Sequence, residues 1–281
     1  MANKKLKAPV NIPVSKIHPF EGNPYKVLDN DEMNNLICSI QEQGILTPII
    51  IRPIENTDEY EVISGHRRLH ATVKAGMKEV PAFIYAVTRD EAAIMLVDSN
   101  LHREHILPSE KAFAYKLKLE AMKHQGITCG QVGHKSRDEI SDTDSGRQIQ
   151  RYIRLTYLIP ELLDLVDEEK IALTPAVELS YLTDEEQYAL LGSIEVEDRT
   201  PSLSQAVRFK KLSQTGNLSD DDIETIMQED KANQKPMFKV SMEKLQEIAP
   251  RVKDKDFEDF VLKACEHYYR YLLRQRDRDS R

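Results

Sequence analysis

Every β-rich run of this 281-residue chain lies before residue 108, and beyond that point the apolar residues recur only at helical spacing. The early runs are short and are separated by polar turns: residues 48–52, 60–63 and 80–84. A helix from about Arg67 to Lys74 joins the last two runs, which predicts a compact β-α-β unit. We therefore expect an α+β protein with a small mixed α/β domain, an all-α domain and a C-terminal helix.

Helix start and stop signals divide the chain further. In the first part, helices are expected from Asp31 to Gly44 and from Thr88 to Leu101. In the second part, apolar stripes predict helices around 112–126 and 149–158, then shorter ones at 160–169, 175–181, 183–192, 203–213 and 220–229. A polar stretch over 229–236 predicts a linker, and a final helix follows from about Asp254 to Arg276. The expected domains are 1–107, 108–230 and 236–281.

Charge is unevenly distributed along the chain. The net charge of −8 would by itself argue against a nucleic-acid partner. Residues 161–198, however, hold twelve acidic side chains and one lysine, and residues 219–230 add six acidic side chains and no basic one. The remainder is net positive, so a local basic surface is compatible with the composition.

Several protein classes are disfavoured by composition. No apolar run approaches the ~20 residues that a membrane helix needs, and the N-terminus has no apolar secretory stretch. Cys38, Cys129 and Cys265 are scattered and form no C-x-x-C pair, which favours a reduced cytoplasmic protein without a disulfide framework or zinc knuckle.

Two polar loops of the first domain have phosphate-binding chemistry. Ser64-Gly65-His66-Arg67-Arg68 follows a strand and opens a helix, where backbone N–H groups and two arginines attract anions. Asp98-Ser99-Asn100-Leu101-His102-Arg103 ends the next helix, and its Asn100 and Arg103 can meet a phosphate or a metal-bound water. Together the loops suggest a polyphosphate pocket, although a solvated helix start and a simple helix cap explain each loop separately.

A third motif has the residue pattern of a helix-turn-helix. Ser145 can cap a helix whose Ile149 and Ile153 face inward. A helix expected near 128–140 would precede this one, which gives the two helices of the motif. The second helix carries Arg and Gln side chains, which can make bidentate contacts to base edges. An ordinary basic helix is the alternative. The side chains expected to point outward toward DNA, beside the cap Ser145, are Arg147, Gln148, Gln150, Arg151 and Arg154.

The C-terminal helix carries an aromatic stripe that includes Phe257, Phe260, Tyr268 and Tyr271. An isolated helix cannot bury this stripe, so the helix is expected to pack on the body or on a second chain. The arginines that follow can contact phosphates or remain solvated.

These motifs, in this order, resemble the ParB partition family in its plasmid- or integrative-element-borne branch. The residues that carry the resemblance are Leu36-Ile37, Gly44-Ile45-Leu46, Pro48-Ile49, Tyr60 to Ala71, Ala75-Gly76, Val80-Pro81-Ala82, Ser99 to Arg103 and Leu107 to Ala112. The likeness covers about residues 12–125 and continues more loosely to about residue 182.

The resemblance implies a homodimeric DNA clamp in the cytoplasm, associated with the nucleoid or a plasmid. Such proteins bind a palindromic centromere-like site on double-stranded DNA, bind CTP with Mg²⁺, close around DNA and recruit a ParA-type ATPase. By resemblance, Gly65, His66, Arg67 and Arg68 would hold the triphosphate, Asn100 would assist the metal and Arg103 would contact phosphate. Asn23-Pro24-Tyr25 matches a stretch near the nucleotide.

Three residues depart from the family pattern: His66 and Ser99 replace glutamates, and His102 replaces a glutamine. Loss of two carboxylates weakens metal coordination and removes groups that could orient water. We expect nucleotide binding, and at most weak CTP hydrolysis.

Two other functions are compatible with parts of the sequence, and a third is disfavoured. A regulator or nucleoid protein could use the same clamp without a ParA partner. A nuclease would need metal-binding carboxylates or histidines, and His66, His70, His102 and His105 are the available histidines. A sulfiredoxin-like enzyme would need a cysteine where Gly65 stands.

Overall fold

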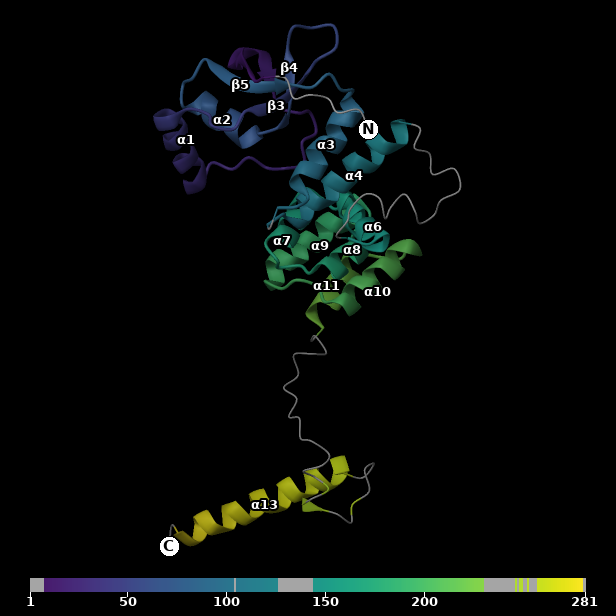
Figure 1. The fold of residues 1–281 in the computed structure, drawn as a ribbon. Helices are drawn as coiled ribbons and strands as arrows, with labels where there is room; N and C mark the ends of the chain where they lie inside the picture. Colours follow the sequence, from purple (N-terminus) through teal and green to yellow (C-terminus); the bar gives the residue numbers. More distant parts are fainter. Residues whose placement is uncertain are drawn as a thin grey trace. The chain divides into compact units, whose positions relative to one another are not determined.

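The computed structural model describes residues 8–103, 105–125, 144–229 and 257–279, together with residues 246, 248, 249 and 252. The chain forms two compact units, Met1–Glu229 and Asp230–Arg281. The first unit contains the sheet and most of the helices (Figure 1). The predicted boundary near residue 107 lies within this first unit and stays a prediction.

A five-stranded mixed sheet forms the N-terminal part of the first unit. Its strands are β1 (Val10–Pro13), β2 (Ile17–His18), β3 (Ile49–Pro53), β4 (Tyr60–Ser64) and β5 (Glu79–Ile84), in the order β1-β5-β3-β4-β2. The strands predicted at 48–52, 60–63 and 80–84 are confirmed. β1 and β2 were not predicted, because runs of four and two residues carry too little alternation to recognise.

The predicted β-α-β unit is wrong in its pairing. β3 lies between β4 and β5, antiparallel to β4 and parallel to β5. The helix that follows β4 therefore leads to a strand that does not pair with β4. Sequence spacing gave the order of the elements but not the insertion of β3 between them.

Four helices accompany the sheet: α1 (Asp31–Gln43), α2 (His66–Lys74), α3 (Arg89–Asn100) and α4 (Pro108–His124). α1 packs on α2 through a core that includes Met33, Ile40 and Ala71. α3 packs against β4 and α4, with Leu96 and Val97 fully buried. The helices predicted in this region are confirmed within one or two residues, apart from the start of α4.

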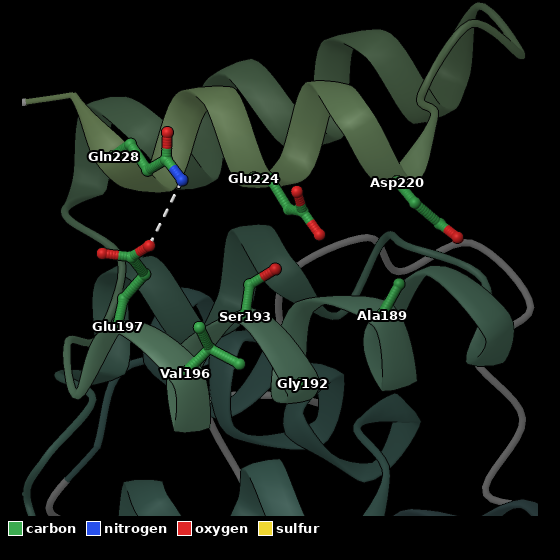
Figure 2. Close-up of a pocket in the computed structure, with 8 residues that line it drawn as sticks. All are labelled: Ala189, Gly192, Ser193, Val196, Glu197, Asp220, Glu224 and Gln228. Atoms are coloured by element: carbon green, nitrogen blue, oxygen red, sulfur yellow. Dashed lines mark hydrogen bonds between the residues drawn. The ribbon is translucent and has the colours of Figure 1, made fainter.

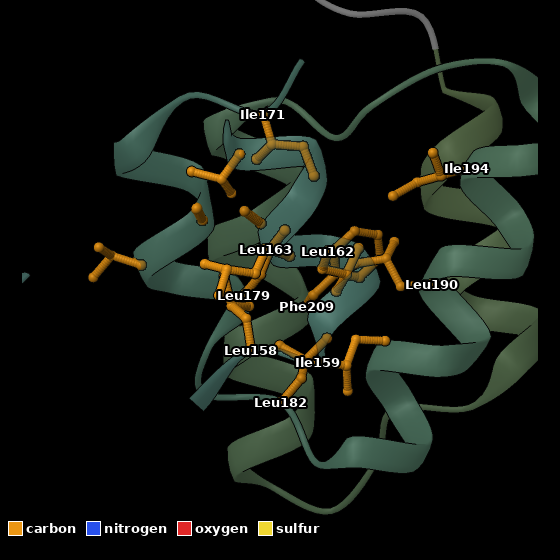
Figure 3. Packing of buried hydrophobic residues seen from close by; sticks show 14 of the residues in the cluster. Leu158, Ile159, Leu162, Leu163, Ile171, Leu179, Leu182, Leu190, Ile194 and Phe209 are labelled. Carbon is orange, nitrogen blue, oxygen red and sulfur yellow. The ribbon is translucent and has the colours of Figure 1, made fainter. Parts of the chain in front are cut away.

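Residues 144–229, the rest of the first unit that the structure describes, are helical as predicted. α6 (Gly146–Arg154) leads through a short 3-10 turn into α7 (Pro160–Asp167), α8 (Leu173–Leu179), α9 (Asp184–Glu197), α10 (Leu203–Gln214) and α11 (Asp220–Gln228). Their shared core is built from aliphatic side chains around Phe209 (Figure 3). Ala112 of α4 joins this core, so α4 contributes to both halves of the unit.

The second unit contains α13 (Phe257–Asp279), which matches the predicted final helix closely. Phe260, Tyr268 and Tyr271 of the predicted stripe are exposed, and the rings of Tyr268 and Tyr271 stack with centroids 6.3 Å apart. No helix in the described ranges is long and apolar enough to cross a membrane.

Candidate nucleotide and DNA sites

The first candidate site is the start of α2, directly after β4. Gly65 occupies the N-cap position with φ of +105°, a conformation that favours glycine, and it has no side chain to cap the helix. A Cβ atom at this position would come within 2.7 Å of Ile49 Cγ2. A side chain at this position would be forced against the buried Ile49, so the start of α2 requires glycine and has no side-chain cap. The uncapped N–H groups of the first turn are donors that can attract an anion.

His66 is the first residue of α2 and is largely buried. Its Nε2 accepts a hydrogen bond from the backbone N–H of Phe20 at 3.4 Å. Burial and then the positive charge of Arg103 lower the pKa of His66 to about 4. The imidazole is therefore neutral at pH 7 and orients the loop that contains Phe20.

Arg103 belongs to the second polar loop, and it lies near the same place. Its guanidinium carbon stands 5.6 Å from the centre of the Tyr25 ring. Because its charge also lowers the pKa of His66, Arg103 and the start of α2 are neighbours. The structure thus brings together Gly65, His66 and Arg103, with Tyr25 beside them.

The other predicted nucleotide residues have partners within the protein. Arg67 Nη2 donates to Glu32 Oε2 of α1 at 2.9 Å. Arg68 Nη1 donates to the carbonyl oxygens of Thr47 and Pro48. Arg68 therefore stabilises the entry to β3, whereas Arg67 is half-exposed and its ion pair is readily exchanged for a phosphate.

Asn100, the predicted metal ligand, lies buried at the end of α3. Its Nδ2 donates to the carbonyl oxygen of Leu96 at 2.7 Å and to Ser99 Oγ at 3.2 Å. No group of three His, Cys, Asp or Glu side chains converges as a metal site in the described ranges. Asn100 can offer one amide oxygen, so Mg²⁺ would depend mainly on phosphate oxygens and water.

Sequence reasoning missed the buried pair that supports the loop containing Phe20. Arg52 and Glu61 face each other across β3 and β4, and Arg52 donates to Glu61 Oε2 from Nη2 at 2.6 Å and from Nε at 2.8 Å. Glu61 Oε1 accepts the backbone N–H of Glu21. Each of these two apolar strands contains one charged residue, and this was the available signal of a buried ion pair. The sequence does not give the register of the strands, which is needed to recognise that the two residues face each other.

The second candidate site is α6. Ser145 caps the helix by accepting the N–H of Gln148, and Ile149 is fully buried against Tyr115 and Met122 of α4. Arg147 is exposed, while Gln148, Gln150 and Arg151 are partly exposed. The helix thus buries the predicted inner face. The preceding helix predicted at 128–140 lies outside the described residues.

Two of the predicted DNA-contacting arginines are held by the protein. Arg151 Nη2 donates to Thr174 Oγ1 at 2.6 Å. Arg154 donates to Ser180, and its guanidinium stacks on Tyr181 and Tyr157 at 3.9 and 4.5 Å from the ring centres. Arg154 therefore does not point freely outward as predicted. The sequence could not reveal this, because Tyr181 and Ser180 are more than twenty positions away.

α6 is joined to α4 at its start as well as along its face. Asp144, just before the cap, accepts hydrogen bonds from Lys111 Nζ at 3.2 Å and from the Tyr115 hydroxyl. Because α4 also packs on α3, a continuous set of contacts runs from the loop of Arg103 to the start of α6.

Comparison with known proteins matches the N-terminal part of the chain to a family. Residues 2–101 match the family described as the ParB N-terminal domain. The chromosome-partitioning protein Spo0J of Thermus thermophilus is 33% identical over 162 residues, covering 58% of this chain and 56% of the relative. The nucleoid occlusion protein of Listeria monocytogenes is 33% identical over 131 residues, covering 47% and 45%.

A solved structure of ParB from Caulobacter crescentus, complexed with CTP-gamma-S, gives a TM-score of 0.33 at 23% identity, covering 67% of this chain and 99% of that one. The chain spans about half the length of the curated relatives it matches. Residues 2–101, which include the whole sheet and the helix opened by Gly65, therefore form a ParB N-terminal domain.

Proposed function

We propose that this protein is a DNA-binding partition protein that binds CTP at the start of α2 and closes as a dimeric clamp on a palindromic DNA site. The observation that supports the nucleotide assignment is Gly65, which has positive φ, packs too closely on Ile49 to be replaced by a larger residue and leaves the first turn of α2 without a side-chain cap. Arg103 and the exchangeable Arg67 would add positive charge beside it.

Different groups of the site would contact the triphosphate in different ways. The N–H groups of the first turn of α2 would contact phosphate oxygens, and Arg103 would neutralise their charge. Mg²⁺, when bound, would screen the charge of the phosphates. The amide oxygen of Asn100 is the protein atom that could coordinate it. With His66 neutral and no carboxylate at positions 99 or 66, hydrolysis would be slow.

Substitution of Gly65 tests this assignment. Gly65→Ala should reduce CTP affinity at least about tenfold, because the new methyl group meets Ile49 and displaces the loop. Gly76→Ala is the matched control, since Gly76 also has positive φ, +72°, but a Cβ there meets nothing within 4 Å. Calorimetric titration with CTP, ATP, GTP and UTP measures both affinity and base preference. Equal CTP affinity in the two variants would contradict the assignment.

DNA binding is assigned to α6, with Arg147, Gln148, Gln150 and Arg151 as the side chains for base edges or phosphates. The DNA site can be obtained by selection of random duplexes on the purified protein. Recovery of a palindromic sequence supports a symmetric dimer on DNA; recovery of no consensus would contradict sequence-specific binding.

A second function is favoured by one of the relatives. Because a nucleoid occlusion protein is among them, the same clamp could serve as a nucleoid or gene regulator without a ParA-type ATPase. Co-purification of a ParA-type ATPase encoded beside this chain would support partition. Failure of such an ATPase to respond to the protein and its DNA site would favour the regulator.

A further inference from the structure

The two most acidic helices of the chain pack side by side and leave a groove between them (Figure 2). α9 and α11 contain nine acidic side chains and no lysine or arginine. The groove has a volume of about 370 Å³. Two acidic segments that are separate in sequence thus meet on one surface, remote in sequence from both candidate sites.

The floor of the groove is apolar and uncovered. Ala189, Gly192 and Val196 line it from α9. Val196 is 83% exposed, and a Cβ built on Gly192 would meet nothing within 4 Å. An aliphatic side chain from another molecule could therefore be buried here without displacing any atom of α9.

Ser193 adds a polar group at the bottom of the groove. The residue is only 8% exposed, and its hydroxyl is directed toward α11 (Figure 2). In the part of the chain that the structure describes, this hydroxyl has no hydrogen-bond partner, and it is accessible from the groove and not enclosed in the core. It is available to a group that enters the groove.

The rim of the groove is acidic. Asp220 and Glu224 extend from α11 toward α9 (Figure 2), one helical turn apart, and neither forms an ion pair with any described residue. Glu197 completes the rim from α9, where its Oε1 accepts a hydrogen bond from Gln228 Nε2 at 3.3 Å. This bond bridges the two helices at one end of the groove.

We propose that this groove binds a basic amphipathic helix from a partner protein. Lysines or arginines on that helix would pair with the rim carboxylates of Asp220, Glu224 and Glu197, and an aliphatic side chain between them would cover Val196 and Gly192. The absence of cations from α9 and α11 makes the groove complementary to a basic polypeptide and repulsive to DNA.

A fluorescein-labelled helical peptide tests this proposal on the full chain. The peptide carries leucines on one face flanked by arginines at i and i+4, and a matched peptide has glutamines in place of the arginines. Fluorescence anisotropy should show binding of the arginine peptide that weakens as salt rises above about 0.15 M. Equal binding of the two peptides, or no binding of either, would overturn the proposal.

Substitutions inside and outside the groove test where the peptide binds. Glu197→Gln with Glu224→Gln should weaken peptide binding at least about tenfold. The control, Glu195→Gln with Asp221→Asn, removes the same charge from the same helices outside the groove and should change affinity less than about twofold. Val196→Arg, at an exposed position that tolerates substitution, should also abolish binding. Equal losses in groove and control variants would show general charge attraction and contradict a groove site.

Discussion

At the scale of single residues, the pKa of His66 lies well below the value of a histidine in solution. Its imidazole is held neutral by burial and by Arg103, and it accepts the N–H of Phe20. Where a family member would carry a glutamate, this chain therefore has an uncharged acceptor. The residue helps to position the loop and adds no charge to the proposed phosphate site.

The depressed pKa of His66 gives a specific pH dependence of stability. Between pH 6.5 and about 4 the unfolded chain binds a proton at this residue and the folded chain does not, so stability falls as the pH falls through this window. The loss should be at most about 3 kcal/mol. Urea unfolding at pH 7, 6 and 5 measures it.

Two variants test whether His66 causes this pH dependence of stability. His66→Gln should flatten the dependence, and His70→Gln, which removes an imidazole from the same helix, should retain it. An unchanged slope in His66→Gln would contradict the buried neutral imidazole.

At the scale of elements, α6 combines residues that we propose to contact DNA with residues that stabilise the fold. Arg154 binds Ser180 and stacks on Tyr157 and Tyr181, whereas Arg147 is exposed. Helical periodicity places all of these residues away from the Ile149 face, so it could not separate the two roles.

Substitutions along α6 should separate them. Gln148→Ala and Arg151→Ala should reduce discrimination between DNA sites by about 1–3 kcal/mol each. Arg151→Ala should also lower the free energy of unfolding by up to about 1 kcal/mol, because it removes the exposed hydrogen bond to Thr174. Arg154→Ala should instead lower the free energy of unfolding by about 1–3 kcal/mol, because it removes hydrogen bonds and two aromatic contacts. Competition binding and thermal unfolding measure the two effects. If Arg154→Ala lost discrimination between DNA sites while Gln148→Ala and Arg151→Ala retained it, the assignment of these roles would be contradicted.

Elements were predictable where local signals specify them. Asn30 and Thr88 cap α1 and α3, and Ser202 and Ser219 cap α10 and α11, close to where the sequence placed these starts. Gly65 and Arg103 were found from local motifs. The strand order, the Arg52–Glu61 pair and the partners of Arg68 and Arg154 depend on contacts between distant segments, which periodicity does not encode.

At the scale of the whole molecule, α13 is the element that would join two chains. Tyr268 and Leu262 are 61% and 62% exposed, but only Tyr268 belongs to the apolar stripe. We expect Tyr268→Lys to raise the dimer dissociation constant at least about tenfold and Leu262→Lys to leave it nearly unchanged. Sedimentation equilibrium measures both. Equal effects of the two lysines would contradict dimerisation through the stripe.

The measurement that tests the proposed function most directly is CTP photocrosslinking to the full chain, with and without its selected DNA site. The account predicts crosslinking to CTP above ATP and GTP, an increase with the DNA site, and at least about tenfold loss in Arg103→Ala. Arg89→Ala, which also removes an arginine stacked on an aromatic ring, should retain crosslinking. No preference for CTP in the presence of the DNA site would contradict the account.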